Sequence, residues 1–177
     1  MNTLPFNLSQ AIEVLERTPL LLDTMLRNLS DGWTIHNEGE ETWSPYDVMG
    51  HLIHGESTDW IARMDIILSD GPNKIFAKFD RFAQFEESKG KTLTQLLDEF
   101  RTVRQKNIAY LKSKKLTEAD LNKTGVHPAF GEVTLKQLLS TWTVHDLNHI
   151  AQISRVMAKQ YATEVGPWIE YLRILKS

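Results

Sequence analysis

The stretch Thr141-Trp-Thr-Val-His-Asp-Leu-Asn-His-Ile-Ala-Gln-Ile-Ser-Arg155 predicts a long helix with two histidines on its inner face. Apolar residues recur every three or four positions from Leu135 to Val156, a pattern typical of an amphipathic helix. His145 and His149 continue this apolar stripe and not the solvent-facing side. Four residues turn an α-helix by about 400°, so the two imidazoles lie about one turn apart. Both rings can therefore face one metal ion.

A second histidine-bearing helix is predicted upstream, in Trp43-Ser-Pro-Tyr-Asp-Val-Met-Gly-His-Leu-Ile-His-Gly-Glu56. Residues 44–47 combine an N-cap serine, a proline at the first helical position and an acid in the first turn. We expect the helix to run to about Leu68, with His51 on its inner face. The expected buried stripe consists of Val48, Leu52, Gly55, Ala62 and Ile66.

Together the two segments resemble the DinB/YfiT-like family of metal-binding four-helix bundles. The resemblance is carried by a Trp-Ser-x-x-(Asp/Glu)-Val-x-x-His-Leu helix start, a long variable crossover and His-Asp-x-x-His-Ile-x-Gln. In that family one histidine of the second helix and two of the fourth hold a divalent metal. The resemblance therefore implies one divalent ion per chain, with zinc or nickel expected, held by His51, His145 and His149.

Three other histidines are alternatives or bystanders. His54 lies about 60° around the helix from His51, so it is a rival ligand or a hydrogen-bonding partner behind the ligands. His127 precedes a proline in a segment that predicts a tight reversal, and extended backbone is expected there. His36 falls in the polar stretch 30–42, which is typical of a loop, and is expected to be exposed.

Several polar residues near the histidines are candidates for supporting chemistry. Glu56 and Asp59 could simply be solvated carboxylates on the helix surface. Alternatively, one of them could be a metal ligand or a general base. Asp146 and Gln152 flank the histidine pair and could orient the imidazoles, although Asp146 lies about 100° from His145 and could equally face solvent.

The fold class predicted for the whole chain is an all-α, four-helix up-down bundle with a long crossover between the second and third helices. Its 177 residues, 41% of them hydrophobic, suit a single domain over residues 1–177. The first helix, within residues 7–29, is expected to be broken or kinked at Pro19, with Thr18 capping its second segment. The remaining predicted features are a third helix capped by Thr92, a helical turn at residues 118–121, a fourth helix from Thr134 to about Tyr161, and a short C-terminal helix at residues 168–175.

The predicted crossover, from Asp70 to Gly90, carries four phenylalanines at three-residue intervals: Phe76, Phe79, Phe82 and Phe85. This spacing drifts around an α-helix, so short 3₁₀ or irregular structure across the bundle is expected. The aromatic residues either only pack against the bundle or wall a metal pocket. In the second case Arg81 would meet an anionic group of a substrate.

Composition excludes several classes of function. The chain has no cysteine, which excludes disulfides, thiolate ligands and a protein-borne thiol nucleophile. A net charge of −3 argues against nucleic-acid binding. Neither a signal peptide nor an apolar run of membrane-spanning length is apparent, so we expect a cytoplasmic protein without membrane partners.

A site of three histidines leaves coordination positions open, which favours catalysis over scaffolding. We therefore expect a thiol S-transferase that joins a low-molecular-weight thiol, bound to the metal as thiolate, to a small electrophile. The alternatives are a metal-dependent hydrolase, in which metal-bound water attacks and Glu56 or Asp59 is the base, and a metal-binding stress protein without turnover. A homodimer is also expected, because the resembled family often pairs and residues 168–175 are largely apolar, although the same residues could instead cap the bundle.

Overall fold

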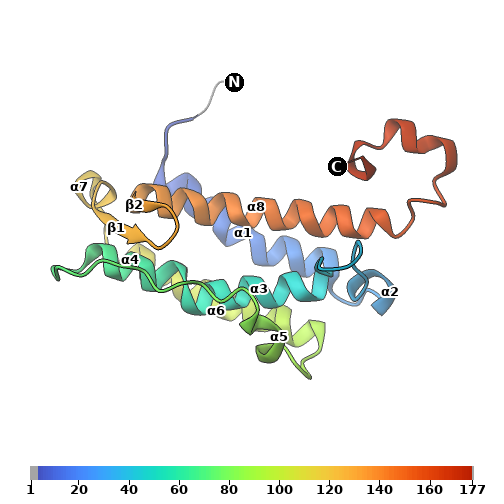
Figure 1. Cartoon of the computed structure of the whole chain (residues 1–177), viewed down its shortest axis with the longest axis horizontal. Helices are drawn as coiled ribbons and strands as arrows, with labels where there is room; N and C mark the ends of the chain where they lie inside the picture. The colour runs from blue at the N-terminus through green and yellow to red at the C-terminus, as the bar shows by residue number, and fades with distance from the viewer. Residues whose placement is uncertain (1–3, 177) are drawn as a thin grey trace.

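The computed structural model describes residues 4–176 and consists mainly of four long helical rods packed as a bundle (Figure 1). The rods are α1 (Leu8–Leu26), α3 and α4 in succession (Pro45–Thr58 and Trp60–Leu68), α6 (Leu93–Ser113) and α8 (Leu135–Lys159). The predicted all-α bundle with its long crossover is therefore confirmed. Because the crossover returns the chain to the end of the bundle where α3 begins, α6 runs in the same direction as α3 and α4 (Figure 1), so the expected up-down alternation is interrupted between the second and third rods.

Capping boxes set where three of the four rods begin. In α3, α6 and α8 the N-cap hydroxyl accepts a hydrogen bond from the third helical residue, whose side chain binds back to the N-cap amide. The caps are Ser44, Thr92 and Thr134, as predicted. These local signals fix the register of α3 and α8, and with it the positions of the three histidines.

Two apolar clusters fill the bundle. One lies towards the end at which α8 begins and includes Leu15, Met64, Ile108 and Trp142. The other lies towards the opposite end and includes Leu22, Met49, Phe100 and Ile153. Polar and charged side chains occupy the middle of the bundle, around Glu56, Arg104, Asn107 and Asp146.

The predicted break of the first helix at Pro19 is wrong, because α1 is continuous and Pro19 lies inside it. Thr18 is not a cap, since its hydroxyl donates to the carbonyl oxygen of Val14 (3.1 Å). A proline has no amide proton, which leaves the carbonyl four residues earlier without its helical partner. That carbonyl belongs to Leu15, and it accepts a hydrogen bond from the Arg104 guanidinium (2.9 Å).

The predicted helix from residue 44 to residue 68 is interrupted at Asp59, whose φ of −113° and ψ of −69° separate α3 from α4. The interruption rotates the side of α4 that faces the core relative to the corresponding side of α3. Ala62 is consequently exposed and Ile66 only half-buried, whereas Arg63, Met64 and Ile67 point inwards. The expected buried stripe is therefore correct for α3 and wrong for α4.

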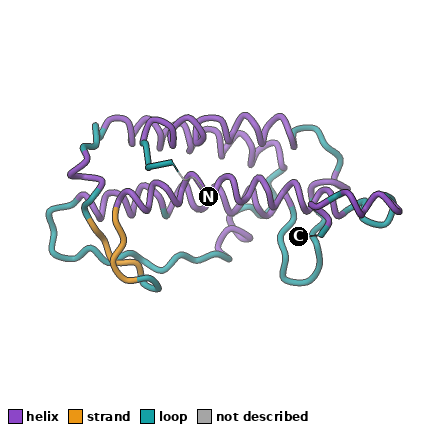
Figure 2. The backbone as a smooth tube through the Cα atoms, turned by 90° about the horizontal axis from the view of Figure 1, so that it is seen from above, coloured by secondary structure: helices purple, strands orange, loops and turns teal. Residues whose placement is uncertain are grey.

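The crossover is irregular apart from the short helix α5 (Ala83–Glu87), and Phe76 anchors it in the core. A hairpin of β1 (Thr124–His127) and β2 (Gly131–Thr134) was not predicted. It lies beside the crossover (Figure 2), and two backbone hydrogen bonds connect them. The Phe76 amide donates to the Val126 carbonyl (2.9 Å), and the Val126 amide donates to the Lys74 carbonyl (2.8 Å). Gly125 permits this packing, because a methyl group there would lie 2.5 Å from the Phe76 ring.

The remaining elements are short. α2 (Asp31–Thr34) lies in the segment predicted as loop, and α7 (Glu118–Leu121) is the predicted helical turn. The C-terminal residues form two 3₁₀ turns, η1 (Gly166–Tyr171) and η2 (Arg173–Leu175), in place of one helix. Within residues 4–176, none of the helices has the length and apolarity needed to span a membrane.

Candidate metal centre

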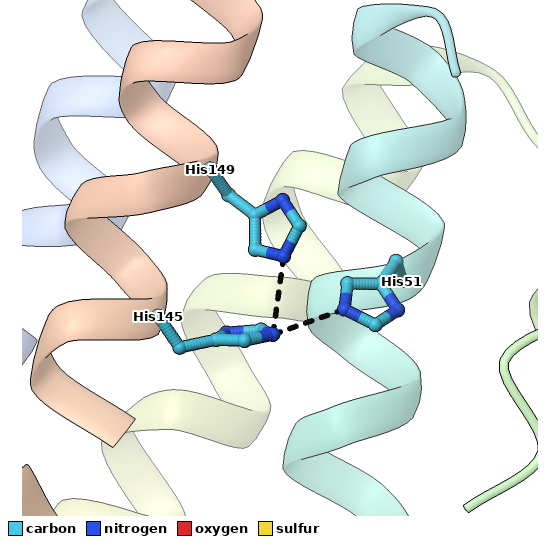
Figure 3. Close-up of side chains that lie close together, drawn as sticks. All are labelled: His51, His145 and His149. Atoms are coloured by element: carbon cyan, nitrogen blue, oxygen red, sulfur yellow. Dashed lines mark hydrogen bonds between the residues drawn. The ribbon is translucent and has the colours of Figure 1, made fainter. Parts of the chain in front are cut away.

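His51 of α3 and His145 and His149 of α8 turn their Nε2 atoms towards a common point in the bundle (Figure 3). Nε2 of His145 lies 3.0 Å from Nε2 of His51 and 3.1 Å from Nε2 of His149. All three nitrogens lie within 4.8 Å of one another. The helical spacing of four residues and the packing of α8 against α3 thus create one cluster of three nitrogen donors.

Burial keeps the three imidazoles neutral. Loss of solvent is the main cause that lowers the pKa of His51 to about 3 and that of His145 to about 2, and His149 contributes to both shifts. Burial also lowers the pKa of His149, opposed by its hydrogen bond to Gln152 and by the charge of Asp146. A neutral imidazole offers a lone pair, which is the form that binds a metal.

The cluster fits a divalent metal ion. Zinc bound by histidine nitrogens at about 2.0–2.1 Å in tetrahedral geometry separates the nitrogens by about 3.3 Å. Two of the three separations, 3.0 and 3.1 Å, are close to that value. Metal ligation through Nε2 places the ring proton on Nδ1, and His149 Nδ1 faces Gln152 Oε1 at 2.8 Å. Gln152 therefore orients one imidazole, as the sequence suggested.

Aromatic side chains enclose the three histidines. Trp43, directly before the N-cap of α3, packs against His51 with ring centres 4.8 Å apart and stacks on His149 at 6.4 Å. Trp60 contacts His145 edge-on at 5.1 Å, and Phe79 of the crossover contacts His51 at 5.6 Å. This apolar collar lowers the local dielectric and limits the access of water to the nitrogens.

A buried ionic network lies behind the histidines. Arg104 of α6, 1% exposed, donates to both carboxylate oxygens of Asp146 (2.6 and 2.9 Å) and pairs with Glu56 (2.8 Å). Glu56 also accepts hydrogen bonds from Asn107 (2.9 Å) and from the Trp142 indole (2.8 Å). The network joins α3, α6 and α8, so it fixes the distance between the helices that carry the histidines.

Sequence reasoning did not identify Arg104 and Asn107, and it left open whether Asp146 faces solvent. Asp146 is fully buried and binds Arg104, not an imidazole. A signal was present, because Arg104 follows Phe100 by four residues and precedes Ile108 by four, which places it on the apolar stripe of its helix. A charged residue on a buried stripe requires a charged partner from another helix.

The two candidate general bases have different surroundings. Both oxygens of Glu56 are hydrogen-bonded within the buried network. Asp59 instead lines a pocket that reaches the histidines, where it pairs with Arg63 at 2.6 Å. Burial raises the pKa of Asp59 to about 6, and the charge of Arg63 opposes this shift.

The other three histidines lie outside the cluster. His54 is buried beside α5, and its Nδ1 lies 2.8 Å from Glu87 Oε2. His127 is in the hairpin, where its Nδ1 accepts a hydrogen bond from the Ala129 amide (3.1 Å). His36 is exposed. Each therefore has surroundings that differ from the three-nitrogen cluster.

The pocket that opens towards His51 and His145 has a volume of about 780 Å³. Its walls come from α3, α4, the crossover, the turn of the hairpin and, through His145, α8. Arg81, the predicted contact for an anionic substrate group, is one of its lining residues, and the charge of Arg81 contributes to the lowered pKa of His51. The crossover therefore forms a wall of the pocket in addition to packing on the bundle.

Comparison with known proteins places the chain in a family. It resembles YfiT from Bacillus subtilis, described as "a probable metal-dependent hydrolase with an unusual four-helix bundle topology", with a TM-score of 0.74, 19% identity and coverage of 92% of this chain and 93% of that one. A second solved structure, TT2238, a four-helix bundle protein, aligns with a TM-score of 0.51 and 20% identity over 84% of this chain and 98% of that one. A search of curated proteins gives no match. The family model of the DinB superfamily matches residues 15–153, and the chain therefore belongs to the DinB superfamily.

Proposed function

We propose that this protein is a metal-dependent enzyme that transfers a low-molecular-weight thiol to a small electrophile. The observation that carries the proposal is the convergence of three neutral imidazoles beside an open pocket. A divalent ion held by His51, His145 and His149, with zinc or nickel preferred, would supply a Lewis acid that lowers the pKa of a thiol or a water molecule.

The side chains around the cluster would divide the remaining tasks. The histidines hold the ion, and the aromatic collar of Trp43, Trp60 and Phe79 excludes water. Arg81 would orient an anionic group of a substrate. In the reaction the thiol sulfur forms a bond to the electrophilic carbon, the leaving group departs with the electron pair of its bond, and the thiol proton passes to solvent. Because the chain has no cysteine, the thiol must be a cosubstrate.

Hydrolysis is the second candidate function, and the position of Asp59 favours it. A carboxyl group with a pKa raised to about 6, in the same pocket as His51 and His145, suits a general base that takes a proton from water. The description of YfiT as a probable metal-dependent hydrolase agrees with this alternative. A metal-binding stress protein without turnover would use the same ligands.

One experiment separates the three candidates. Protein purified without chelator is assayed for conjugation of glutathione, bacillithiol or mycothiol to a chloronitroarene, with release of chloride, and in parallel for hydrolysis of esters and amides. We expect thiol-dependent conjugation that His51→Ala abolishes and that His36→Ala, a change at an exposed histidine, leaves intact. Thiol-independent hydrolysis lost in His51→Ala would favour the hydrolase. Metal-dependent turnover in neither assay would favour a binding protein.

Metal content tests the ligand assignment itself. We expect His145→Ala and His149→Ala to lose the ion, as measured by elemental mass spectrometry, and His54→Ala to keep it. The assignment is wrong if His145→Ala and His149→Ala stay folded and keep their full metal content while His54→Ala loses the metal.

A further inference from the structure

The pocket beside the histidines has one wall built from two segments far apart in sequence. The crossover supplies Lys78, Phe79 and Arg81, and the hairpin turn supplies residues 127–130. Val126 of the hairpin holds the two segments together through backbone hydrogen bonds with Lys74 and Phe76 of the crossover. The wall is therefore a composite surface, and both parts of it face a ligand in the same pocket.

The crossover gives this wall an excess of positive charge. Lys78 and Arg81 are exposed, and within residues 4–176 neither is ion-paired with a carboxylate. The Arg81 guanidinium lies over the rings of Trp43 (5.7 Å) and Phe82 (5.3 Å), contacts that leave its charge without an anionic partner. The third cation of the pocket, Arg63, is paired with Asp59 at 2.6 Å. In a chain with a net charge of −3, two cations without a carboxylate partner in one pocket indicate a site for an anionic group.

The hairpin turn gives the same wall an exposed aromatic surface. Phe130 is 78% exposed, and its ring stacks on His127 with ring centres 4.4 Å apart and planes 15° apart. Packing into the core does not explain this pair, because Phe130 is largely solvent-accessible. A flat aromatic surface presented to a pocket suits a planar ring of a ligand, since offset stacking of aromatic rings adds to the gain from simple burial.

We propose that the crossover and the hairpin turn form a subsite for aromatic anions. The planar ring of the ligand packs on the free face of Phe130, whose other face is stacked on His127, and its anionic group pairs with Lys78 and Arg81. The pocket volume of about 780 Å³ is within the range of about 300–1,000 Å³ that is usual for small-molecule sites. That an aromatic anion is the substrate rests on the proposed function, because only an enzyme with a metal at the histidines would convert a molecule bound there. Binding to the subsite itself does not need the metal.

Three probes separate charge from stacking: naphthalene-2-sulfonate, its neutral isostere naphthalene-2-sulfonamide, and methanesulfonate, which has the charge without the ring. Binding is measured by isothermal titration calorimetry on metal-free protein at neutral pH. We expect naphthalene-2-sulfonate to bind about five- to tenfold more tightly than the sulfonamide, the size expected of one or two exposed ion pairs, and more tightly still than methanesulfonate. Equal affinities for the three probes would refute the subsite.

Variants locate the binding. Arg81→Gln should remove the preference for the sulfonate over the sulfonamide, and Phe130→Ala should remove the preference for the naphthalene sulfonate over methanesulfonate. Lys106→Gln and Tyr171→Ala, changes at an exposed cation and an exposed aromatic residue outside the pocket, should alter neither. Unchanged binding in both pocket variants would place the probe elsewhere and overturn the proposal. Because the titrations use metal-free protein, probe binding together with an absence of catalysis by the metal-loaded protein would count against the proposed function and not against the subsite.

Discussion

Arg104 connects more of the bundle than any local pattern in the sequence suggests. Its guanidinium binds the Leu15 carbonyl left free by Pro19, the Glu56 carboxylate of α3 and the Asp146 carboxylate of α8. The flanking negative charges raise the pKa of Arg104 against the effect of its burial, so the cation is retained inside the protein. One side chain thus completes a proline-containing helix and sets the spacing of the two helices that carry the histidines.

Replacing Arg104 should be strongly destabilising. Arg104→Met leaves Glu56 and Asp146 buried without a cation, and loss of one partner of a buried ionic network costs about 3–5 kcal/mol. Urea denaturation followed by circular dichroism measures the change in the free energy of unfolding. The matched control is Arg101→Met, which removes half-exposed ion pairs and should cost less than about 1 kcal/mol. Equal stability of the two variants would argue against a structural role for the network.

The stability of the metal-free protein should depend on the imidazoles as the pH falls. In the folded state burial holds the pKa of His51 at about 3 and that of His145 at about 2, against an ordinary value of 6.5. Below 6.5 the unfolded chain gains protons that the folded chain does not bind, so the free energy of unfolding falls as the pH falls from about 6.5 towards 3.

The variant His51→Asn isolates this contribution. Above about pH 6.5 the pH dependence of the two metal-free proteins should be the same, and below it the stability of the parent should fall more steeply than that of His51→Asn. Urea midpoints across this range provide the measurement, and parallel curves down to pH 5 would contradict the burial of a neutral His51.

At the scale of helices and strands, the sequence predicted what depends on residues near one another. The capping boxes at Thr92 and Thr134 and the apolar stripe of α8 are local signals, and they placed the long helices and the pair His145 and His149 correctly. The resemblance to a known family added His51. Features that depend on distant partners were missed, and the continuous path of α1 through Pro19 is the clearest, because its compensation comes from Arg104, 89 residues after Leu15.

Short elements were missed for a different reason. The hairpin strands contain four residues each, which is too few for an alternating pattern to be distinguished from a polar turn. The interruption at Asp59 also has no proline or glycine at the break itself. Sequence reasoning therefore identified the three histidines that cluster in the structure, but it could not place the pocket wall that the hairpin and the crossover build beside them.

The contact between the hairpin and the crossover can be tested at Gly125. Gly125→Ala introduces a methyl group 2.5 Å from the Phe76 ring and 2.9 Å from Ile67, which should cost about 1–3 kcal/mol and loosen the crossover. Thermal denaturation measures the first effect and limited proteolysis of residues 70–90 the second. Gly71→Ala, where the nearest side-chain atom would be 3.9 Å away, is the control and should behave like the parent. Unchanged proteolysis in Gly125→Ala would show that the hairpin does not hold the crossover.

At the scale of the whole molecule, the bundle should not require its metal in order to fold. Two apolar clusters and the buried ionic network join the helices without any contribution from the three histidines. We expect the helical circular dichroism to persist at room temperature after chelation, with a lower melting temperature that rises again with metal concentration by mass action. Loss of helical signal on chelation would indicate a structural metal.

Self-association remains a prediction from the sequence. Trp168, in η1, and Leu172, between η1 and η2, are 68% and 37% exposed, and a second copy could cover them. We expect sedimentation velocity to show a dimer at micromolar concentration, and Trp168→Ser to weaken it. A monomer at every concentration tested would rule out this expectation.

The distance along the chain between His51 and His145, 94 residues, has a consequence for how the protein is made. Closing so long a segment is entropically costly and is among the slower steps in forming a helical bundle. During synthesis His51 leaves the ribosome long before α8 exists, and a single imidazole is a weak ligand. An ion bound by all three histidines could therefore be held only once α8 is complete and packed against α3, so its binding would report that these two helices have come together.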